Sequence, residues 1–330
     1  MKQFGLIAGV AFAVSVVGAP ARAASYTYTL VDVPGATETR LGGINNSGLA
    51  VGRYVDGGGV HGFTYLNGTI ATFDAPGAYG KTVPLGINDK GQIVGQLTDS
   101  TGYHGFIKTG TVFQIFDLPG AQYTTPWGIN NSGVTVGTAS TPTDPNIAFV
   151  YDGVTAQRIV VPNALTGSTG VFGINNAGVV VGNSSDGTNI RPFSDAAGVF
   201  TSYTVPGLPF AYGFGNNEFG DIVGDGVSNS AGSNGSTGFV ITGGVVTLLN
   251  APGALASPGF GTIASDINDA GVIVGEDRTR TVTRGFITNA TRDVVLVPPT
   301  PPAGTAVPEP GTAVVVLAGL AGLVRRRRQT

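Results

Sequence analysis

A ten-residue pattern that recurs along the chain constrains the fold more than any other feature. It first appears as GINNSGLAVG at 43–52, and the six copies start 43, 42, 45, 42 and 51 residues apart. Repetition at this spacing is typical of a protein built from copies of one supersecondary unit that pack against each other. The other copies are GINDKGQIVG at 86–95, GINNSGVTVG at 128–137, GINNAGVVVG at 173–182, GNNEFGDIVG at 215–224 and DINDAGVIVG at 266–275.

Each repeat has the composition of short β-strands joined by turns. Runs rich in Val, Ile, Thr, Phe and Tyr alternate with Gly, Asn, Asp and Pro, and no segment of the repeat region has helical periodicity. Between Ile44 and Val51 the NNSG quartet predicts a tight hairpin turn. One phenylalanine recurs per unit, at 63, 106, 149, 193, 239 and 286, and a proline closes an apolar run at 34, 76, 119, 162, 206, 252 and 298.

About four strands in ~44 residues are the dimensions of one propeller blade. We therefore predict an all-β fold, a six-bladed β-propeller spanning residues 24–299. The alternative is a β-solenoid, which also stacks repeats but usually has shorter rungs. Residues 26–33 and 293–297 both match the last strand of a unit, so one of them is surplus. We expect the surplus strand to join a blade from the opposite terminus or to cover an open edge.

The N-terminus has the features of a secretory signal peptide. Lys2 precedes an apolar run from Phe4 to Ala19, and Ala21-Arg22-Ala23 provides a small-x-small cleavage site. This order predicts that residues 1–23 are removed and that the mature chain is exported. The alternative is a retained membrane anchor.

The C-terminus ends in a short apolar segment followed by arginines. A proline-rich linker at 300–307 leads to Pro308-Glu309-Pro310 and an apolar run at 312–324. As a helix this run would cover about 20 Å, less than the ~30 Å hydrocarbon core of a bilayer. The four arginines that follow would stay on the cytoplasmic side, so the body would face outward. They are Arg325, Arg326, Arg327 and Arg328.

This tail at 308–330 resembles the PEP-CTERM sorting signal of Gram-negative bacteria. The resemblance implies recognition by an exosortase-type protease-transpeptidase, a transient transmembrane anchor in the inner membrane, and removal of the tail. It also implies delivery to the cell surface or to an exopolysaccharide matrix such as that of a biofilm. Pro308, Glu309 and Pro310 would then form a processing signal. The alternative, a tail anchor on a proline-rich stalk, has the same topology.

The repeats resemble the extracellular HAF repeat, named for a His-Ala-Phe signature. The signature is present as His61-Gly62-Phe63 and His104-Gly105-Phe106, with Ala148-Phe149 keeping its second half. The resemblance covers residues 25–299, and its family has no settled function, so it implies an extracellular location rather than an activity.

Composition excludes several classes of function. Cysteine is absent, which rules out disulfides, thiol catalysis and cysteine-ligated metals. Between the two terminal signals lie eleven basic and nineteen acidic residues, a net charge of −8. This charge argues against nucleic acid and anionic lipid as main partners.

The loop after each VG dipeptide carries an aspartate. In a propeller this loop joins the second and third strands, so it should emerge beside the connectors that carry Asp32, Asp74 and Asp117. These acids predict a candidate ligand or cation face that binds Ca²⁺ or a polysaccharide. The alternative is that aspartate simply favours loop conformations. The six loop acids are Asp56, Asp99, Asp144, Asp186, Asp225 and Asp277.

Other candidate residues give weaker signals. His61 and His104 occupy equivalent positions without a recognisable catalytic partner, which favours a structural contact at a strand edge. Tyr54 and Tyr103 are candidates for stacking on sugars, whereas Trp127 is expected in the core. No catalytic residue and no cofactor other than Ca²⁺ is predicted.

The sequence thus favours an exported, non-catalytic protein of the cell surface or exopolysaccharide matrix that binds or scaffolds through its repeats. Its expected partners are the exosortase-type enzyme and exopolysaccharide. The alternative is a secreted propeller enzyme, a hydrolase or lyase that acts on glycans through a pair of loop carboxylates. The longest insertion, at 227–238, is the expected location of a unit-specific function.

Overall fold

The computed structural model describes residues 26–229, 235–254 and 257–290. The predicted signal peptide, linker and sorting signal at 1–23, 300–307 and 308–330 lie outside the described residues, as does the middle of the insertion at 227–238. Within the described ranges the chain forms strands and turns, and no helix there is long and apolar enough to cross a membrane.

The recurring structural unit is a meander of four strands, each antiparallel to the one before it. In the first, β2 (Glu38–Ile44), β3 (Ala50–Asp56), β4 (Gly59–Leu66) and β5 (Thr69–Phe73) follow one another. Next come β6 (Thr82–Ile87), β7 (Ile93–Thr98), β8 (Tyr103–Thr109) and β9 (Val112–Phe116), and then β10 (Tyr123–Ile129), β11 (Thr135–Ser140), β12 (Ile147–Tyr151) and β13 (Ala156–Arg158).

The second half of the chain repeats this order. It contains β14 (Gly170–Ile174), β15 (Val180–Ser185), β16 (Ile190–Ala196) and β17 (Val199–Ser202), followed by β18 (Phe210–Asn216), β19 (Ile222–Val227), β20 (Thr237–Thr242) and β21 (Val245–Leu249). The last meander comprises β22 (Gly261–Ile267), β23 (Ile273–Arg278) and β24 (Thr283–Ala290), and its outer strand is β1 (Tyr26–Val31) from the N-terminal end of the repeat region.

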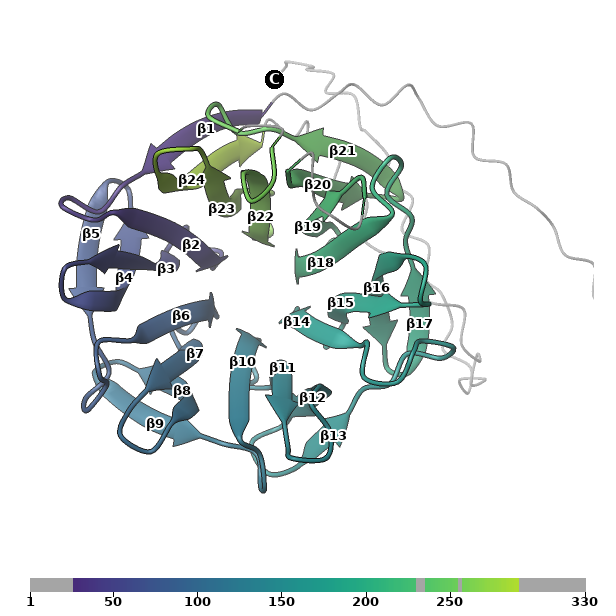
Figure 1. The fold of residues 1–330 in the computed structure, drawn as a ribbon, viewed down its shortest axis with the longest axis horizontal. Helices are drawn as coiled ribbons and strands as arrows, with labels where there is room; N and C mark the ends of the chain where they lie inside the picture. The colour runs from purple at the N-terminus through teal and green to yellow at the C-terminus, as the bar shows by residue number, and fades with distance from the viewer. Residues whose placement is uncertain (1–25, 230–234, 255–256, 291–330) are drawn as a thin grey trace, which may run out of the picture. The chain divides into compact units, whose positions relative to one another are not determined.

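The meanders are arranged around a central axis (Figure 1), with β2, β6, β10, β14, β18 and β22 innermost. The prediction of an all-β, propeller-like fold is confirmed, and the antiparallel pairing differs from the parallel rungs of a β-solenoid. The expectation that a terminal strand joins the opposite end of the repeat region is also confirmed, because β1 pairs with β24 along its whole length. The competing strand at 293–297 lies outside the described residues.

A β-bulge in every innermost strand explains the glycines of the repeat. The pairing register shifts by one residue just before each GIN motif, for example between Pro84 and Gly86. The glycine of the VG dipeptide faces this bulge: a Cβ on Gly95 would lie 2.2 Å from the carbonyl oxygen of Val83 and 2.8 Å from the ring of Phe106. Phe106 is fully buried, and so is its equivalent in every other unit. The VG and Phe signatures therefore mark one tightly packed spot that has no room for a side chain at the glycine.

The bulge also directs one side chain per unit away from the sheet, as bulges commonly do. The GIN glycine that follows allows the next unit to approach closely, since a Cβ on Gly86 would lie 2.5 Å from the carbonyl oxygen of Trp127. The bulged residues are Gly42, Leu85, Trp127, Phe172, Phe214 and Ser265.

The asparagine of the GIN motif holds both its own turn and the neighbouring unit. In Asn88 the side-chain oxygen accepts hydrogen bonds from the backbone N–H groups of Lys90 and Gln92, and Nδ2 donates to the carbonyl oxygen of Asn130 at 2.9 Å. The same inter-unit bond recurs from unit to unit until Nδ2 of Asn268 donates to the carbonyl oxygen of Asn45 at 3.1 Å. The intermediate bonds are Asn45 to Asn88, Asn130 to Asn175, Asn175 to Asn217 and Asn217 to Asn268.

The next residue in each turn forms a second series of inter-unit hydrogen bonds. The backbone N–H of Asn46 donates to Asp89 at 2.8 Å, and the N–H of Asp89 donates to the side-chain oxygen of Asn131 at 2.9 Å. The series continues through the remaining units and returns to Asn46, whose side chain accepts from the N–H of Asp269. The bonds between are Asn131 to Asn176, Asn176 to Glu218 and Glu218 to Asp269.

Asp266 replaces the GIN glycine in the last unit and links it to the first. Its Oδ2 accepts a hydrogen bond from the backbone N–H of Ile44 at 3.0 Å, and its Oδ1 accepts from the N–H of Ile267 at 2.9 Å. Burial raises the pKa of Asp266 to about 7, although both hydrogen bonds act in the opposite direction. Burial likewise raises the pKa of Asp225, to about 6.

The inter-unit role of the GIN asparagine is testable by Asn130→Asp. Aspartate keeps the oxygen that accepts from Ser132 and Val134 but loses the N–H that donates to Asn175. We expect the free energy of unfolding to fall by about 1–3 kcal/mol, because a buried carbonyl oxygen loses its partner. Urea unfolding measures the change. The control is Asn250→Asp, since the side chain of Asn250 is exposed. Equal stability of Asn130→Asp and the wild type would contradict the role.

The raised pKa of Asp266 predicts a specific pH dependence of stability. The unfolded carboxyl group loses its proton near pH ~4, whereas the folded one keeps it to about pH 7. The folded chain therefore binds more protons between these values, so the free energy of unfolding decreases as pH rises across this window and levels off above it.

We expect Asp266→Asn to make the decrease between pH 5 and 7 shallower, measured by urea unfolding at several pH values. Asp186→Asn is the control. Hydrogen bonds from the backbone N–H groups of Asn189 and Thr188 hold the pKa of Asp186 well below its usual range. Its carboxylate is therefore ionised in both states over the window. Identical slopes for Asp266→Asn and the wild type would contradict the assignment.

Candidate functional site

A pocket of about 250 Å³ is lined by the middle of the innermost strands and by residues of β3 and β23 beside them. Its apolar side is formed by four bulged residues from successive units, Leu85, Trp127, Phe172 and Phe214. Its charged side is formed by residues of the first and last units, namely Arg40, Arg53, Glu276 and Arg278. The bulged residues of these two units, Gly42 and Ser265, are small and leave room for the charged groups.

The aromatic side of the pocket is held by edge-to-face contacts. The ring centroids of Trp127 and Phe172 lie 5.3 Å apart with planes at 73°, and those of Phe172 and Phe214 lie 5.4 Å apart at 84°. The indole N–H of Trp127 donates to the hydroxyl of Thr138 at 3.1 Å, which fixes the ring orientation. The prediction that Trp127 belongs to the core is wrong, because the bulge directs its partly exposed side chain into the channel.

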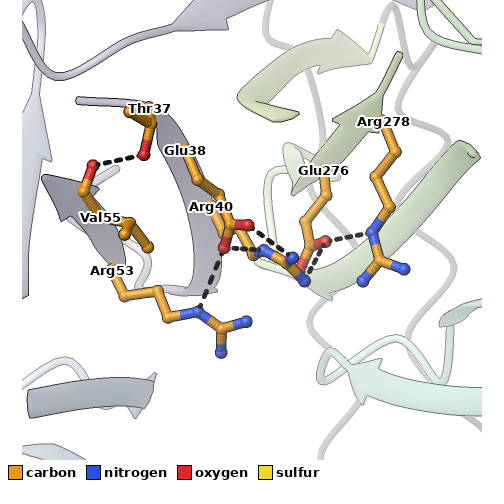
Figure 2. A network of polar contacts seen from close by, with 7 residues as sticks. All are labelled: Thr37, Glu38, Arg40, Arg53, Val55, Glu276 and Arg278. Atoms are coloured by element: carbon orange, nitrogen blue, oxygen red, sulfur yellow. Dashed lines mark hydrogen bonds and ion pairs between the residues drawn. The ribbon is translucent and has the colours of Figure 1, made fainter. Parts of the chain in front are cut away.

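The charged side is organised around Arg40 (Figure 2). Its Nε and Nη2 donate to the two carboxylate oxygens of Glu38 at 2.5 and 2.9 Å, and its Nη1 donates to Glu276 at 3.1 Å. Glu276 also accepts from Nε of Arg278 at 2.8 Å, while Nε of Arg53 lies 3.8 Å from Glu38. Arg40 therefore donates hydrogen bonds to both glutamates and joins the first unit to the last.

The three arginines and two glutamates carry one excess positive charge (Figure 2), and the buried Asp225, whose pKa burial raises to about 6, acts electrostatically on Arg278 and offsets part of it. Burial alone would raise the pKa of Glu38, but the hydrogen bond and charge of Arg40 outweigh it and lower that pKa. Burial and the neighbouring Arg40 lower the pKa of Arg53, although arginine stays protonated in proteins. Arg53 and Arg278 contact the glutamates through Nε, and among the residues drawn in Figure 2 no contact reaches their Nη groups.

The charged side is built by the first and last units, and the four middle units do not repeat it. The position of Arg53, directly after VG, is occupied by Gln96, Thr138, Asn183 and Asp225 in the four middle units. Residues shared by the units do not reveal this site, because its charged groups occur in the first and last units and not in the four between them. The available signal was the reverse, a residue before GIN and one after VG that differ between copies.

The opposite end of the channel is smaller and polar. It has a volume of about 90 Å³ and is lined by the GIN turns, including Asn46, Asp89 and Asn131. The bulged residues line this space as well, so it adjoins the larger pocket. Burial would raise the pKa of Asp89, but hydrogen bonds from Asn131 and Asn46 lower it overall. The carboxylate oxygens at this end already bind neighbouring turns, so they hold units together.

The prediction that all six acids lie in the loop after VG is wrong for two of them. Asp56 ends β3, and Asp99, Asp144 and Asp186 lie in loops, whereas Asp225 and Asp277 lie within β19 and β23. The first four each accept a backbone N–H two residues later in their own loop, the contact that stabilises an Asx turn. These four also face a cation or a histidine: Asp56 faces His61, Asp99 faces His104, Asp144 faces Arg158 and Asp186 faces Arg191.

Asp225 and Asp277 are buried, with 6% and 1% of their surface exposed. Burial raises the pKa of Asp277, whose carboxylate accepts from the N–H of Gly253. Among the described residues, no group of three or more His, Cys, Asp or Glu side chains is arranged to hold a metal ion. Calcium on this face would have to displace the present partners of the acids.

Both histidines bridge two acids. His61 lies between Asp56 and Asp74, with Nδ1 2.8 Å from the latter, and His104 lies between Asp99 and Asp117, with Nδ1 2.6 Å from the latter. The hydrogen bonds from these second aspartates raise the pKa of each imidazole. In the first two units a histidine therefore joins the loop acid to the connector acid.

The tyrosines of the same loops already have ring contacts. Tyr54 stacks on His61 with centroids 5.1 Å apart. Tyr103 meets Tyr123 edge to face at 5.4 Å, and the amine of Lys81 lies 4.8 Å from its centroid. The aromatic rings available to a ligand in the channel are those of Trp127, Phe172 and Phe214.

The chain matches no protein-family model and no curated protein. Among solved structures, a gluconolactonase from Xanthomonas campestris shares 14% identity over 77% of this chain and 88% of its own, with a TM-score of 0.47. The Aleuria aurantia lectin in complex with Fucα1-6GlcNAc shares 11% over 76% and 91%, with a TM-score of 0.47.

A Hadza microbial sialidase shares 12% identity over 77% of this chain, with a TM-score of 0.45. The chain spans 66% of that sialidase, slightly less than two thirds of its length. Likenesses at this level carry no information about the ligand or reaction of this chain.

Proposed function

We propose that this chain is an exported, non-catalytic binding protein of the cell surface or exopolysaccharide matrix, and that its channel pocket holds a glycan. The observation that carries the proposal is the pocket itself, where an aromatic arc faces a polar, charged wall. Ligand pockets typically combine apolar and aromatic lining with a few polar groups that fix orientation. Aromatic faces suit the C–H face of a sugar ring, and fixed polar groups suit its hydroxyls.

We propose further that residues 26–290 close into a six-bladed propeller. Three links between the last and first units support closure. Nδ2 of Asn268 donates to the carbonyl of Asn45, Asp266 accepts from Ile44, and β1 pairs with β24. A closed ring would fix the bulged side chains around one axis and keep the pocket rigid.

The sorting proposal rests on the sequence of the two termini. A signal peptide at 1–23 and a PEP-CTERM tail at 308–330 would deliver the folded repeats to the outside of a Gram-negative cell. The net charge of −8 between these signals suits a hydrated matrix better than nucleic acid or anionic lipid.

The competing function is a secreted enzyme that cleaves glycans. Such an enzyme needs one protonated carboxyl group as its general acid. Arg40 lowers the pKa of Glu38 despite burial, and hydrogen bonds from Thr101 lower the pKa of Asp99. Both groups are therefore ionised at neutral pH. Burial raises the pKa of Asp225 and Asp277, but only 6% and 1% of their surfaces are exposed, so neither presents its carboxyl group to a glycan. Together these observations support the binding proposal over the enzymatic one.

The binding proposal predicts retention of the protein on polysaccharide. The full chain, produced in an exosortase-bearing bacterium and recovered from its surface, is mixed with that bacterium's exopolysaccharide with and without Ca²⁺. We expect co-sedimentation with no change in polymer length. Phe172→Ala should weaken retention about tenfold, because one wall of the pocket is lost. Tyr79→Ala is the control, since Tyr79 is 72% exposed on a connector away from the channel. Shortening of the polymer would favour the enzyme instead.

The sorting proposal predicts a dependence on Glu309. In the same host, Glu309→Ala should leave the tail attached and the protein in the membrane fraction, whereas the wild type is released with the mass of the trimmed chain. Mass spectrometry of the surface and membrane fractions measures this. A control substitution in the linker, Thr305→Ala, should be processed normally. Release of both variants alike would contradict exosortase processing.

A further inference from the structure

We infer that the channel pocket selects a carboxylate-bearing sugar residue, a hexuronate, whose ring lies on the aromatic arc while its carboxylate pairs with Arg53 and Arg278. This inference rests on the proposed function and specifies its ligand. It follows from which arginines in the pocket are already occupied, from the excess charge and from the position of the aromatic rings.

Arg40 is occupied by protein groups. All three kinds of nitrogen in its guanidinium donate to carboxylates, two bonds to Glu38 and one to Glu276. Its side chain is 20% exposed and lies between the two glutamates (Figure 2). Arg40 therefore holds the charged side together and is not the group that meets a ligand.

Arg53 and Arg278 are in a different condition. Each has one contact through Nε, to Glu38 at 3.8 Å and to Glu276 at 2.8 Å. Their Nη groups are without a partner in the described ranges, although the two side chains are only 29% and 28% exposed. A partly buried guanidinium with free donors is costly unless something accepts from it. Two such groups in the lining of one small pocket point to an anionic ligand.

The charge of the pocket favours a monoanion. Three arginines outnumber the two glutamates by one. Asp225, which acts electrostatically on Arg278, offsets part of this positive charge, although burial raises its pKa to about 6. The remaining balance suits a single carboxylate better than a multiply charged anion. Guanidinium groups also match the planar carboxylate, with paired N–H donors directed at its two oxygens. A doubly charged phosphate would bring excess negative charge close to Glu38 and Glu276, which share the same cluster.

The aromatic arc requires that the anion be attached to a ring with an apolar face. Trp127, Phe172 and Phe214 line the same pocket as the two arginines. The volume of about 250 Å³, with the adjoining space of about 90 Å³ beyond the bulged residues, lies at the lower end of the usual ~300–1,000 Å³ of small-molecule sites, so it suits one ring rather than a long segment of polymer. The ligand is thus a single uronate residue, at a chain end or as a side branch of an acidic polysaccharide.

The arginines of the pocket can attract an acidic polysaccharide even though the mature chain as a whole is negatively charged. A charge of −8 between the terminal signals repels a polyanion at long range, and salt screens this repulsion beyond about 10 Å at 0.1 M. Recognition would therefore depend on contacts within the pocket, and binding would persist at moderate salt concentration.

The test uses the wild-type protein, produced from the full chain as above, and the fluorescence of its single tryptophan, Trp127. D-glucuronate is compared with D-glucuronamide, which has the same ring without the charge, with glucose and with inorganic phosphate. We expect glucuronate to change the fluorescence and to bind at least about tenfold more tightly than glucuronamide or phosphate. Isothermal titration calorimetry checks the affinities independently.

The matched variants are Arg53→Gln and Arg278→Gln, each expected to weaken glucuronate binding about 10- to 100-fold while leaving glucose unchanged. Lys90→Gln is the control, because Lys90 is exposed on a GIN turn at the other end of the channel. The comparison of glucuronate with glucuronamide needs no variant, so a folding defect in either arginine variant would not block the test.

The outcomes separate this inference from the proposed function. Equal binding of glucuronate and glucuronamide, or equal binding of glucuronate and phosphate, would overturn the uronate assignment. Retention on exopolysaccharide without any effect of these sugars on Trp127 would overturn the pocket assignment and leave matrix binding intact. If the protein is not retained on the polysaccharide and also binds none of these sugars, the proposed function is overturned as well.

Discussion

The hydrogen bond from each GIN asparagine to the next unit is the interaction on which the rest of this structure depends. The buried side chain uses its oxygen to close its own turn and its amide nitrogen to bind the neighbouring turn. Aspartate lacks the donor and glutamine has a longer reach, so asparagine is the residue that satisfies both contacts. Repeating one short bond between neighbours sets the spacing of the units around the axis. That spacing in turn demands glycine at Gly86, where the adjacent backbone leaves no room for a Cβ.

Close approach at the glycines frees another position to vary. The bulge turns one residue per unit out of the sheet toward the axis, where the larger side chains, such as Trp127 and Phe172, meet edge to face across neighbouring units. Leu85 and Trp127 can therefore occupy equivalent places, while Gly42 and Ser265 leave space for Arg40 and Glu276. A constant framework thus supports a lining that varies around the channel. The pocket therefore has an aromatic side and a charged side, which can orient a bound ligand.

The repeats alone predicted much of the fold, because strand composition, turn residues and the recurring phenylalanine are local signals. The hairpin at NNSG, the burial of Phe63 and the absence of helices across the described ranges all follow from them. The site was not predictable in the same way. The contact between Arg40 and Glu276 joins residues 236 positions apart, which only the meeting of the first and last units brings together. A search for residues shared by every unit selects loop acids such as Asp56, which stabilise their own turns.

The meeting of the first and last units combines stability and recognition in one region. Here β1 pairs with β24, Asp266 replaces a glycine to reach Ile44, and Arg40 bridges two glutamates. Arg53 and Arg278 gain little stability from this arrangement, since their outer donors have no partner among the described residues. A hydrophobic residue at either place would extend the apolar lining of the pocket without leaving a donor unpaired. The arginines are therefore better explained by a ligand than by folding, and the strong contacts around them keep their guanidinium groups in position for it.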